Sequence, residues 1–107
     1  MTLATVPPLA CNIQAISAAD RPRYNDLVKR LRLALQDRSE LSDGYVYKLD
    51  TKTITLPEVA EWITMEQLCC PFLSFQLDVR TDGASQLTLQ GPAGAKAILR
   101  EEFPENR

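Results

Sequence analysis

The sequence predicts an α+β fold, a two-layer ferredoxin-like sandwich in which an antiparallel or mixed sheet of four to five strands carries two to three helices on one face. The main observation is that segments with apolar residues at every second position alternate with segments whose apolar residues recur three and four positions apart. A length of 107 residues suits one hydrophobic core. We therefore expect residues 1–107 to form a single domain, with 1–8 and 104–107 loosely ordered.

The first half of the chain is expected to contain a strand, a helix and a hairpin. Residues 9–16 alternate between apolar and polar side chains, which predicts a strand with Cys11 on its apolar face. Pro22 is tolerated only in a first helical turn, so a helix is expected to begin near residues 19–21. The apolar stripe of this helix comprises Tyr24, Leu27, Val28, Leu31 and Leu35.

A polar connection over residues 37–43 is expected to lead into a strand at 45–49. Residues 53–56 are rich in β-branched side chains and predict a short partner strand, which would complete a hairpin. The sheet face away from the helices is either solvated or paired with a second subunit, so a homodimer is one expectation. The side chains that could form that contact are Tyr45, Tyr47 and Val46.

The second half is expected to contain a helix, a second hairpin and a terminal helix. Thr55 and Glu58 have the spacing of a capping box, which predicts a helix from Pro57 to about Cys69. Residues 73–79 alternate regularly and predict a strand that turns at Asp82-Gly83 into a partner containing Leu87 and Leu89. Gly91-Pro92 ends that strand and opens the third helix.

Charge and hydropathy argue against nucleic-acid binding and against a signal peptide or membrane span. Twelve basic and fourteen acidic residues give a net charge of −2 without a basic block, so nucleic-acid binding has no support. Residues 1–10 are apolar but short, and they contain Pro7-Pro8, so neither a signal peptide nor a membrane span is expected.

The cysteines carry the functional prediction. There are three, two of them adjacent, which argues against a secreted disulfide framework and favours the cytoplasm. The chain contains no histidine, which removes the commonest metal ligand and general base. Glu66 precedes Cys69 and Cys70 by three and four positions, so in a helix the carboxyl group and the sulfurs converge. Cys11 could join them from the first strand. Three thiolates without imidazole suit a soft metal ion or metalloid, with Glu66 as an extra ligand or a neighbour of the ligands.

Other interpretations of these residues stay open. The alternative for each cysteine is that it packs as a small buried hydrophobe, and the alternative for Glu66 is that it points to solvent. Pro71 leaves two cases for Cys70, which sits either at the start of a new turn, where its thiol would be activated, or at a helix end, where it would not. Tyr45, Trp62 and Phe72 are candidates for lining a pocket, with core packing as the alternative.

The segment Glu66-x-x-Cys69-Cys70-Pro71-Phe72-x-x-Phe75 resembles a motif of a family of small uncharacterised bacterial proteins with no established activity. The resemblance extends to Asp43-Gly44-Tyr45 and to Gly91-Pro92-x-Gly94-x-Lys96, and so covers most of the chain. It implies that Cys11, Glu66, Cys69 and Cys70 belong together. It implies no reaction, and no catalytic residue is assigned. Besides ion binding, the sequence leaves a thiol-dependent redox enzyme and a structural or partner-binding module as alternative functions.

Overall fold

The structure is a computed structural model that describes residues 9–105. Loose order was predicted for residues 1–8 and 104–107. Residues 1–8 and 106–107 lie outside the described residues. The elements follow one another as η1 (Ile13–Ala15, a 3-10 turn), α1 (Arg21–Ala34), β1 (Leu35–Leu41), β2 (Gly44–Leu49), α2 (Leu56–Cys69), β3 (Ser74–Val79), β4 (Ser85–Gln90) and α3 (Ala95–Glu102).

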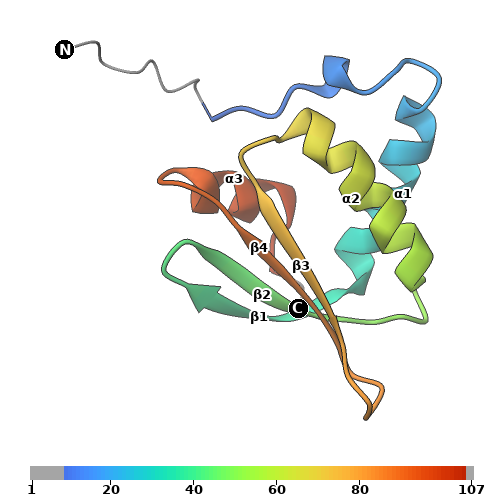
Figure 1. Cartoon of the computed structure of the whole chain (residues 1–107), viewed down its shortest axis with the longest axis vertical. Coiled ribbons are helices and arrows are strands. Elements are labelled where there is room, and N and C mark those ends of the chain that lie inside the picture. The colour runs from blue at the N-terminus through green and yellow to red at the C-terminus, as the bar shows by residue number, and fades with distance from the viewer. Residues whose placement is uncertain (1–8, 106–107) are drawn as a thin grey trace.

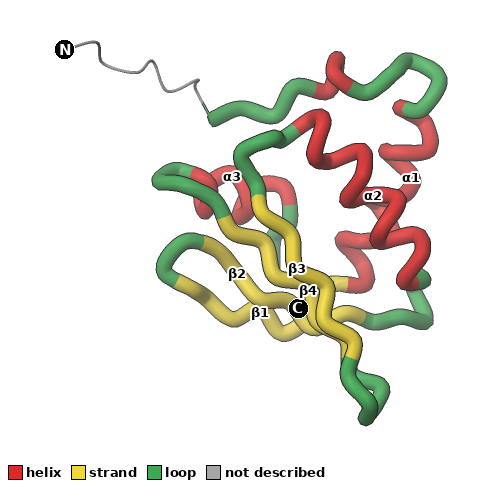
Figure 2. Tube along the Cα trace, in the orientation of Figure 1, coloured by secondary structure: helices red, strands yellow, loops and turns green. Residues whose placement is uncertain are grey.

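The predicted α+β class and two-layer sandwich are confirmed, with three α-helices and a four-stranded antiparallel sheet among the described residues. The strands lie in the order β1-β2-β4-β3. Figure 1 shows α1 and α2 side by side, and α3 packs separately against β2 and β4. Figure 2 shows the β3–β4 hairpin, whose turn extends beyond the rest of the sheet.

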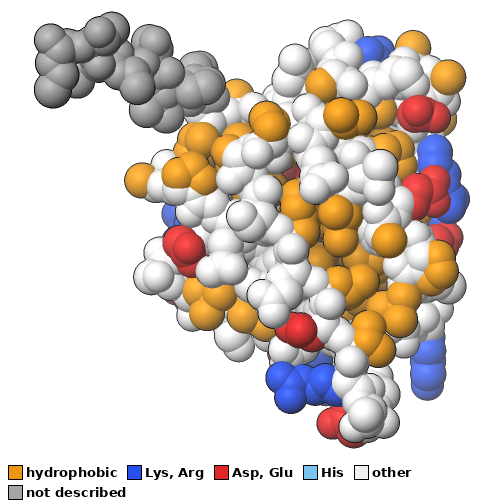
Figure 3. All heavy atoms as spheres, viewed as in Figure 1, with side chains coloured by type: hydrophobic (Ala, Val, Ile, Leu, Met, Phe, Trp, Pro, Cys, Tyr) orange, Lys and Arg blue, Asp and Glu red, His pale blue; other side chains and the backbone are white. Residues whose placement is uncertain are grey.

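One face of the sheet holds the core. Tyr45 pairs with Leu89, which pairs in turn with Phe75, so these three side chains share a face. The ring of Trp62 on α2 packs against that face, with its centroid 5.6 Å from the ring of Phe75 and 5.6 Å from that of Phe103 after α3. Hydrophobic side chains reach the surface along the seam between β3 and α2 (Figure 3). The helices therefore cover the face that carries the aromatic strand residues.

The expected dimer patch is wrong for two of its three residues. Tyr45 and Tyr47 are each 2% exposed and face the helices. Val46 lies on the opposite face, between neighbours that include Lys48 and Thr88. That face is polar because its positions alternate with the aromatic ones along the same strand.

Two predicted strands are wrong. Residues 9–16 form an extended segment with the η1 turn, and Ile16 is its one buried side chain among those described. Residues 51–53 form a turn, in which the Asp50 carboxylate accepts hydrogen bonds from the Lys52 amide and the Thr53 hydroxyl, and residues 54–55 lead directly into α2. Neither the alternation in the first segment nor the β-branched residues of the second produce a strand, because no strand within residues 9–105 pairs with either segment.

The predicted polar connection over residues 37–43 is also wrong, because β1 occupies most of it. Among the strands within residues 9–105, β1 lies at the edge of the sheet and pairs only with β2. Most of its side chains are therefore exposed, and the strand needs no apolar alternation. Asp37, with φ of 47°, marks the irregularity in its register.

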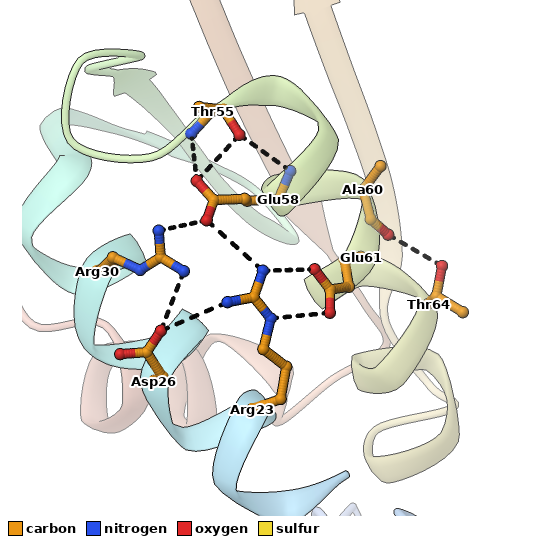
Figure 4. A network of polar contacts seen from close by, with 8 residues as sticks. All are labelled: Arg23, Asp26, Arg30, Thr55, Glu58, Ala60, Glu61 and Thr64. Carbon is orange, nitrogen blue, oxygen red and sulfur yellow. Dashed lines mark hydrogen bonds and ion pairs between the residues drawn. The ribbon is translucent and has the colours of Figure 1, made fainter.

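A capping box fixes the start of α2, as predicted. The Thr55 side chain accepts a hydrogen bond from the Glu58 amide, and Glu58 Oε1 accepts one from the Thr55 amide at 3.0 Å. Glu58 also pairs with Arg30 of α1, while Arg23 of α1 forms a two-bond contact with Glu61 (Figure 4). The Thr55 amide and then Arg30 lower the pKa of Glu58 to about 2. This network holds α1 against α2.

Candidate functional site

A disulfide joins the N-terminal segment to the end of α2. Cys11 and Cys70 are 59 positions apart in sequence, and their Cα atoms lie 4.6 Å apart. The Asn12 amide donates a 2.8 Å hydrogen bond to the Cys69 carbonyl, which adds a second link at the same place. Cys11 therefore reaches the second helix as the sequence predicted, although from an extended segment rather than a strand.

The Cys11–Cys70 disulfide was not predicted. The odd number of cysteines and the strained ring that the adjacent Cys69 and Cys70 would form indicated no secreted disulfide framework. The bond instead joins Cys70 to a distant residue, which the fold brings close. Cys69 stays a free thiol.

Cys69 is the last residue of α2 and is 3% exposed. Its sulfur lies within 4.8 Å of those of Cys11 and Cys70, so the three cysteines form one cluster. Burial, together with the smaller effects of the nearby carboxyl groups of Glu66 and Glu102, raises the pKa of the Cys69 thiol to about 11. Cys69 is therefore protonated at neutral pH.

The local sequence explains why the thiols lie at a helix end. Pro71 disfavours helical conformation at Cys70, which has φ of −126° and ψ of 73° and caps the helix. The Cys70 amide donates a 2.7 Å hydrogen bond to the Glu66 carbonyl, closing the last turn. Of the two cases that the sequence left open, the structure shows the helix end, where the helix dipole does not stabilise a thiolate.

Glu66 lies beside the sulfurs and is completely buried. Its Oε1 accepts a 2.7 Å hydrogen bond from the Tyr24 hydroxyl, while its Oε2 has no hydrogen-bond partner among the described residues. Burial, followed by the neighbouring Glu102 carboxyl group, raises the pKa of Glu66 to about 9. Glu66 thus carries a proton at neutral pH, and the interpretation that it points to solvent is wrong.

Sequence reasoning missed two residues of the site, Tyr24 and Glu102. Tyr24 was expected only in the core stripe of its helix, yet its hydroxyl contacts both Glu66 and Glu102. An oxygen of Glu102 lies 3.9 Å from the sulfur of Cys11, and a second carboxyl-rich cluster comprises Glu66, Cys70 and Glu102. Only the packing of α3 brings Glu102 here, so no local pattern could have indicated it.

A cavity of about 460 Å³ opens beside the cluster. Cys11 and Cys69 form part of its wall, and α1 forms much of the rest. A second hollow of about 420 Å³ adjoins it and shares Cys11, Arg32 and Glu102. The disulfide therefore borders open space on its Cys11 side, while Cys70 is fully buried.

The predicted pocket-lining aromatic residues do not line this cavity. Trp62 is fully buried in the core, and Phe72 is half-buried against it. The Tyr45 hydroxyl accepts a 2.9 Å hydrogen bond from Arg100, and the Arg38 guanidinium lies 4.5 Å from the centre of its ring. These residues support the fold that positions the cysteines.

The site thus combines a disulfide, a free buried thiol and a protonated carboxylic acid at the joint of the N-terminal segment, α2 and α3. With the disulfide reduced, it would offer three sulfur ligands. No helix within residues 9–105 is long and apolar enough to span a membrane. Comparison with protein-family models, curated proteins and solved structures finds no match to this chain.

Proposed function

We propose that the protein, with its disulfide reduced, binds a soft metal ion or metalloid through Cys11, Cys69 and Cys70. The observation that carries the proposal is that the three sulfur atoms lie within 4.8 Å of one another. Thiolates bonded to one ion at about 2.3 Å lie at comparable separations. The thiol state that this requires is the one maintained in the cytoplasm, which we propose as the compartment.

The surroundings suit a soft ion. All three ligands are thiolates, and the chain contains no histidine to attract harder transition metals. Three thiolates around a divalent ion leave one net negative charge. Because the raised pKa of Glu66 keeps its carboxyl group neutral at neutral pH, that group adds no further negative charge beside the ion.

The test is titration of the fully reduced protein with Cd²⁺, followed by thiolate-to-metal charge-transfer absorption, and with arsenite, followed by loss of free thiols. We expect one ion per chain, and strong weakening in Cys69→Ser and Cys70→Ser. Glu61→Gln, which removes a surface carboxylate 42% exposed, serves as the control and should bind as the wild type does. Binding that survives removal of both Cys69 and Cys70 would refute the proposal.

A second candidate is thiol–disulfide exchange, favoured by the Cys11–Cys70 disulfide itself. Cys11 lines the open cavity while Cys70 is fully buried, so an attacking thiol would reach Cys11 rather than Cys70. If the bond is redox-active, dithiothreitol should reduce it in the folded protein and oxidised dithiothreitol should restore it. A bond that is reduced only after unfolding would contradict this function.

A further inference from the structure

Charged side chains line the cavity beside the disulfide. Lys29 and Arg32 of α1 line the cavity beside Cys11, together with the carboxyl-bearing residue Glu102. Arg32 donates a 2.7 Å hydrogen bond from Nε to the Glu102 backbone carbonyl, which ties α1 to the end of α3 at this point. The cavity thus has a fixed frame with two cations and one carboxylate at its rim.

Lys29 is the cation at this cavity whose ammonium group is not engaged by another residue. Its side chain is exposed, and the ammonium group forms no ion pair or hydrogen bond with residues 9–105. The basic residues elsewhere on α1 behave differently, because Arg23 and Arg30 are engaged with Glu61 and Glu58 of α2. An ammonium group without an acidic partner, next to a cavity that contains a reducible sulfur, is suited to an anionic ligand.

We propose that this cavity binds a small thiol that carries a carboxylate, and that this thiol is the reductant of the Cys11–Cys70 disulfide. The inference rests on the redox-active disulfide proposed above, and it adds the class of substrate. A volume of about 460 Å³ falls within the usual range of about 300–1,000 Å³ for small-molecule pockets. Lys29 orients the carboxylate while the sulfur of the ligand approaches Cys11.

The reaction takes two thiols. The first loses its proton to solvent, and its thiolate attacks the Cys11 sulfur, forming a mixed disulfide. The bond between Cys11 and Cys70 breaks, and Cys70 leaves as a thiolate that takes up a proton. A second thiolate attacks the ligand sulfur of the mixed disulfide and releases Cys11. Two ligand thiols are oxidised to one disulfide, and one protein disulfide is reduced to two thiols.

The consequence for ion binding is direct. Cys11 and Cys70 belong both to the disulfide and to the three-sulfur cluster. The oxidised protein lacks two of the three thiolates, so reduction by the anionic thiol is the step that makes the ion site available. The two proposals share residues but can fail separately.

The experiment measures the rate at which the folded wild-type protein is reduced by three thiols: mercaptoacetate (anionic), mercaptoethanol (neutral) and cysteamine (cationic). The variant is Lys29→Gln, and the matched control is Lys48→Gln, an exposed lysine on the opposite face of the sheet. We expect Lys29→Gln to slow reduction by mercaptoacetate about fivefold at low salt and to leave the neutral thiol unaffected. Each variant is compared with the wild type for the same thiol, which cancels the intrinsic reactivity of the reagent.

The outcomes separate the proposals. If Lys29→Gln slows all three thiols equally, or none, the anionic-thiol inference is overturned while the redox-active disulfide stands. If no thiol reduces the folded protein, the anionic-thiol inference and the redox-active disulfide are both refuted. Cd²⁺ binding by protein that was reduced while unfolded and then refolded tests the ion site independently. Unchanged thermal unfolding of Lys29→Gln would show that its effect is not a loss of fold.

Discussion

The Tyr24 hydroxyl donates a 2.7 Å hydrogen bond to the buried carboxyl group of Glu66, across 42 positions of sequence. The bond joins α1 to α2 directly behind the cysteine cluster. Burial, and next the charge of Glu66, also raise the pKa of Tyr24 above its ordinary value, so the hydroxyl stays protonated and keeps donating. The pair therefore acts as a neutral polar contact inside an apolar core.

Replacing Glu66 by Gln is expected to stabilise the protein increasingly as pH rises. The pKa of Glu66 is about 9 in the folded state against the ordinary 4.5. Below about pH 4.5 the Glu66 carboxyl group is protonated in both the folded and the unfolded protein. Between about pH 4.5 and 9 it is protonated only in the folded protein. Ionisation in this range therefore favours the unfolded chain, and stability falls as pH rises. The slope from this one group is at most about 1.4 kcal/mol per pH unit.

The measurement is urea unfolding of the wild type and Glu66→Gln from mildly acidic to mildly alkaline pH. Gln preserves an oxygen that can accept from Tyr24, so packing is retained. Glu61→Gln, at a surface carboxyl group whose pKa is lowered mainly by Arg23, is the control and should not reproduce the trend. Parallel stability curves for the wild type and Glu66→Gln would contradict a buried neutral acid.

Removing the disulfide is expected to lower the free energy of unfolding by about 4 kcal/mol, the chain-entropy value for a loop of this length. Cys11→Ser should show this loss without reductant, and reduced wild type should show a similar one. Cys69→Ser keeps the disulfide and serves as the control. Equal losses in Cys11→Ser and Cys69→Ser would indicate packing rather than the covalent link.

Cys69 is expected to react slowly with an alkylating reagent while the protein is folded. Burial raises its pKa to about 11, so the thiolate fraction at neutral pH is at least about a hundredfold below that of an unperturbed cysteine. The matched control places Leu68→Cys in a Cys69→Ser background, since Leu68 is the preceding residue of the same helix and is 56% exposed. That thiol should label quickly, and equal rates for the two sites would refute the buried state of Cys69.

Thr55→Ala is expected to destabilise the protein by about 1 kcal/mol, because it removes the side-chain cap of α2. Thr64→Ala is the control within the same helix. The Thr64 hydroxyl donates a hydrogen bond to the Ala60 carbonyl (Figure 4), a contact that adds little to helix stability. Chemical denaturation of both variants provides the comparison, and similar losses would show that the cap has no special role.

Local signals in the sequence were sufficient to predict α1 and α2. A proline in the first turn, the Thr55 cap and apolar stripes at helical spacing act over a few residues, and the structure has both helices near the expected positions. The hairpin of β3 and β4 was predictable for the same reason, from alternation around Asp82-Gly83. The edge strand β1 was not, because its backbone pairs with β2 while its side chains stay largely exposed.

The sequence alone determined that Cys69 and Cys70 lie together at one helix end, and it predicted that Cys11 could reach them. Only the tertiary structure decided how they are connected. The disulfide partner of Cys70, the proton on Glu66 and the presence of Glu102 all depend on contacts between segments far apart in the chain. Such contacts are set by how α1, α2 and α3 pack, and a pKa follows from the burial that this packing creates.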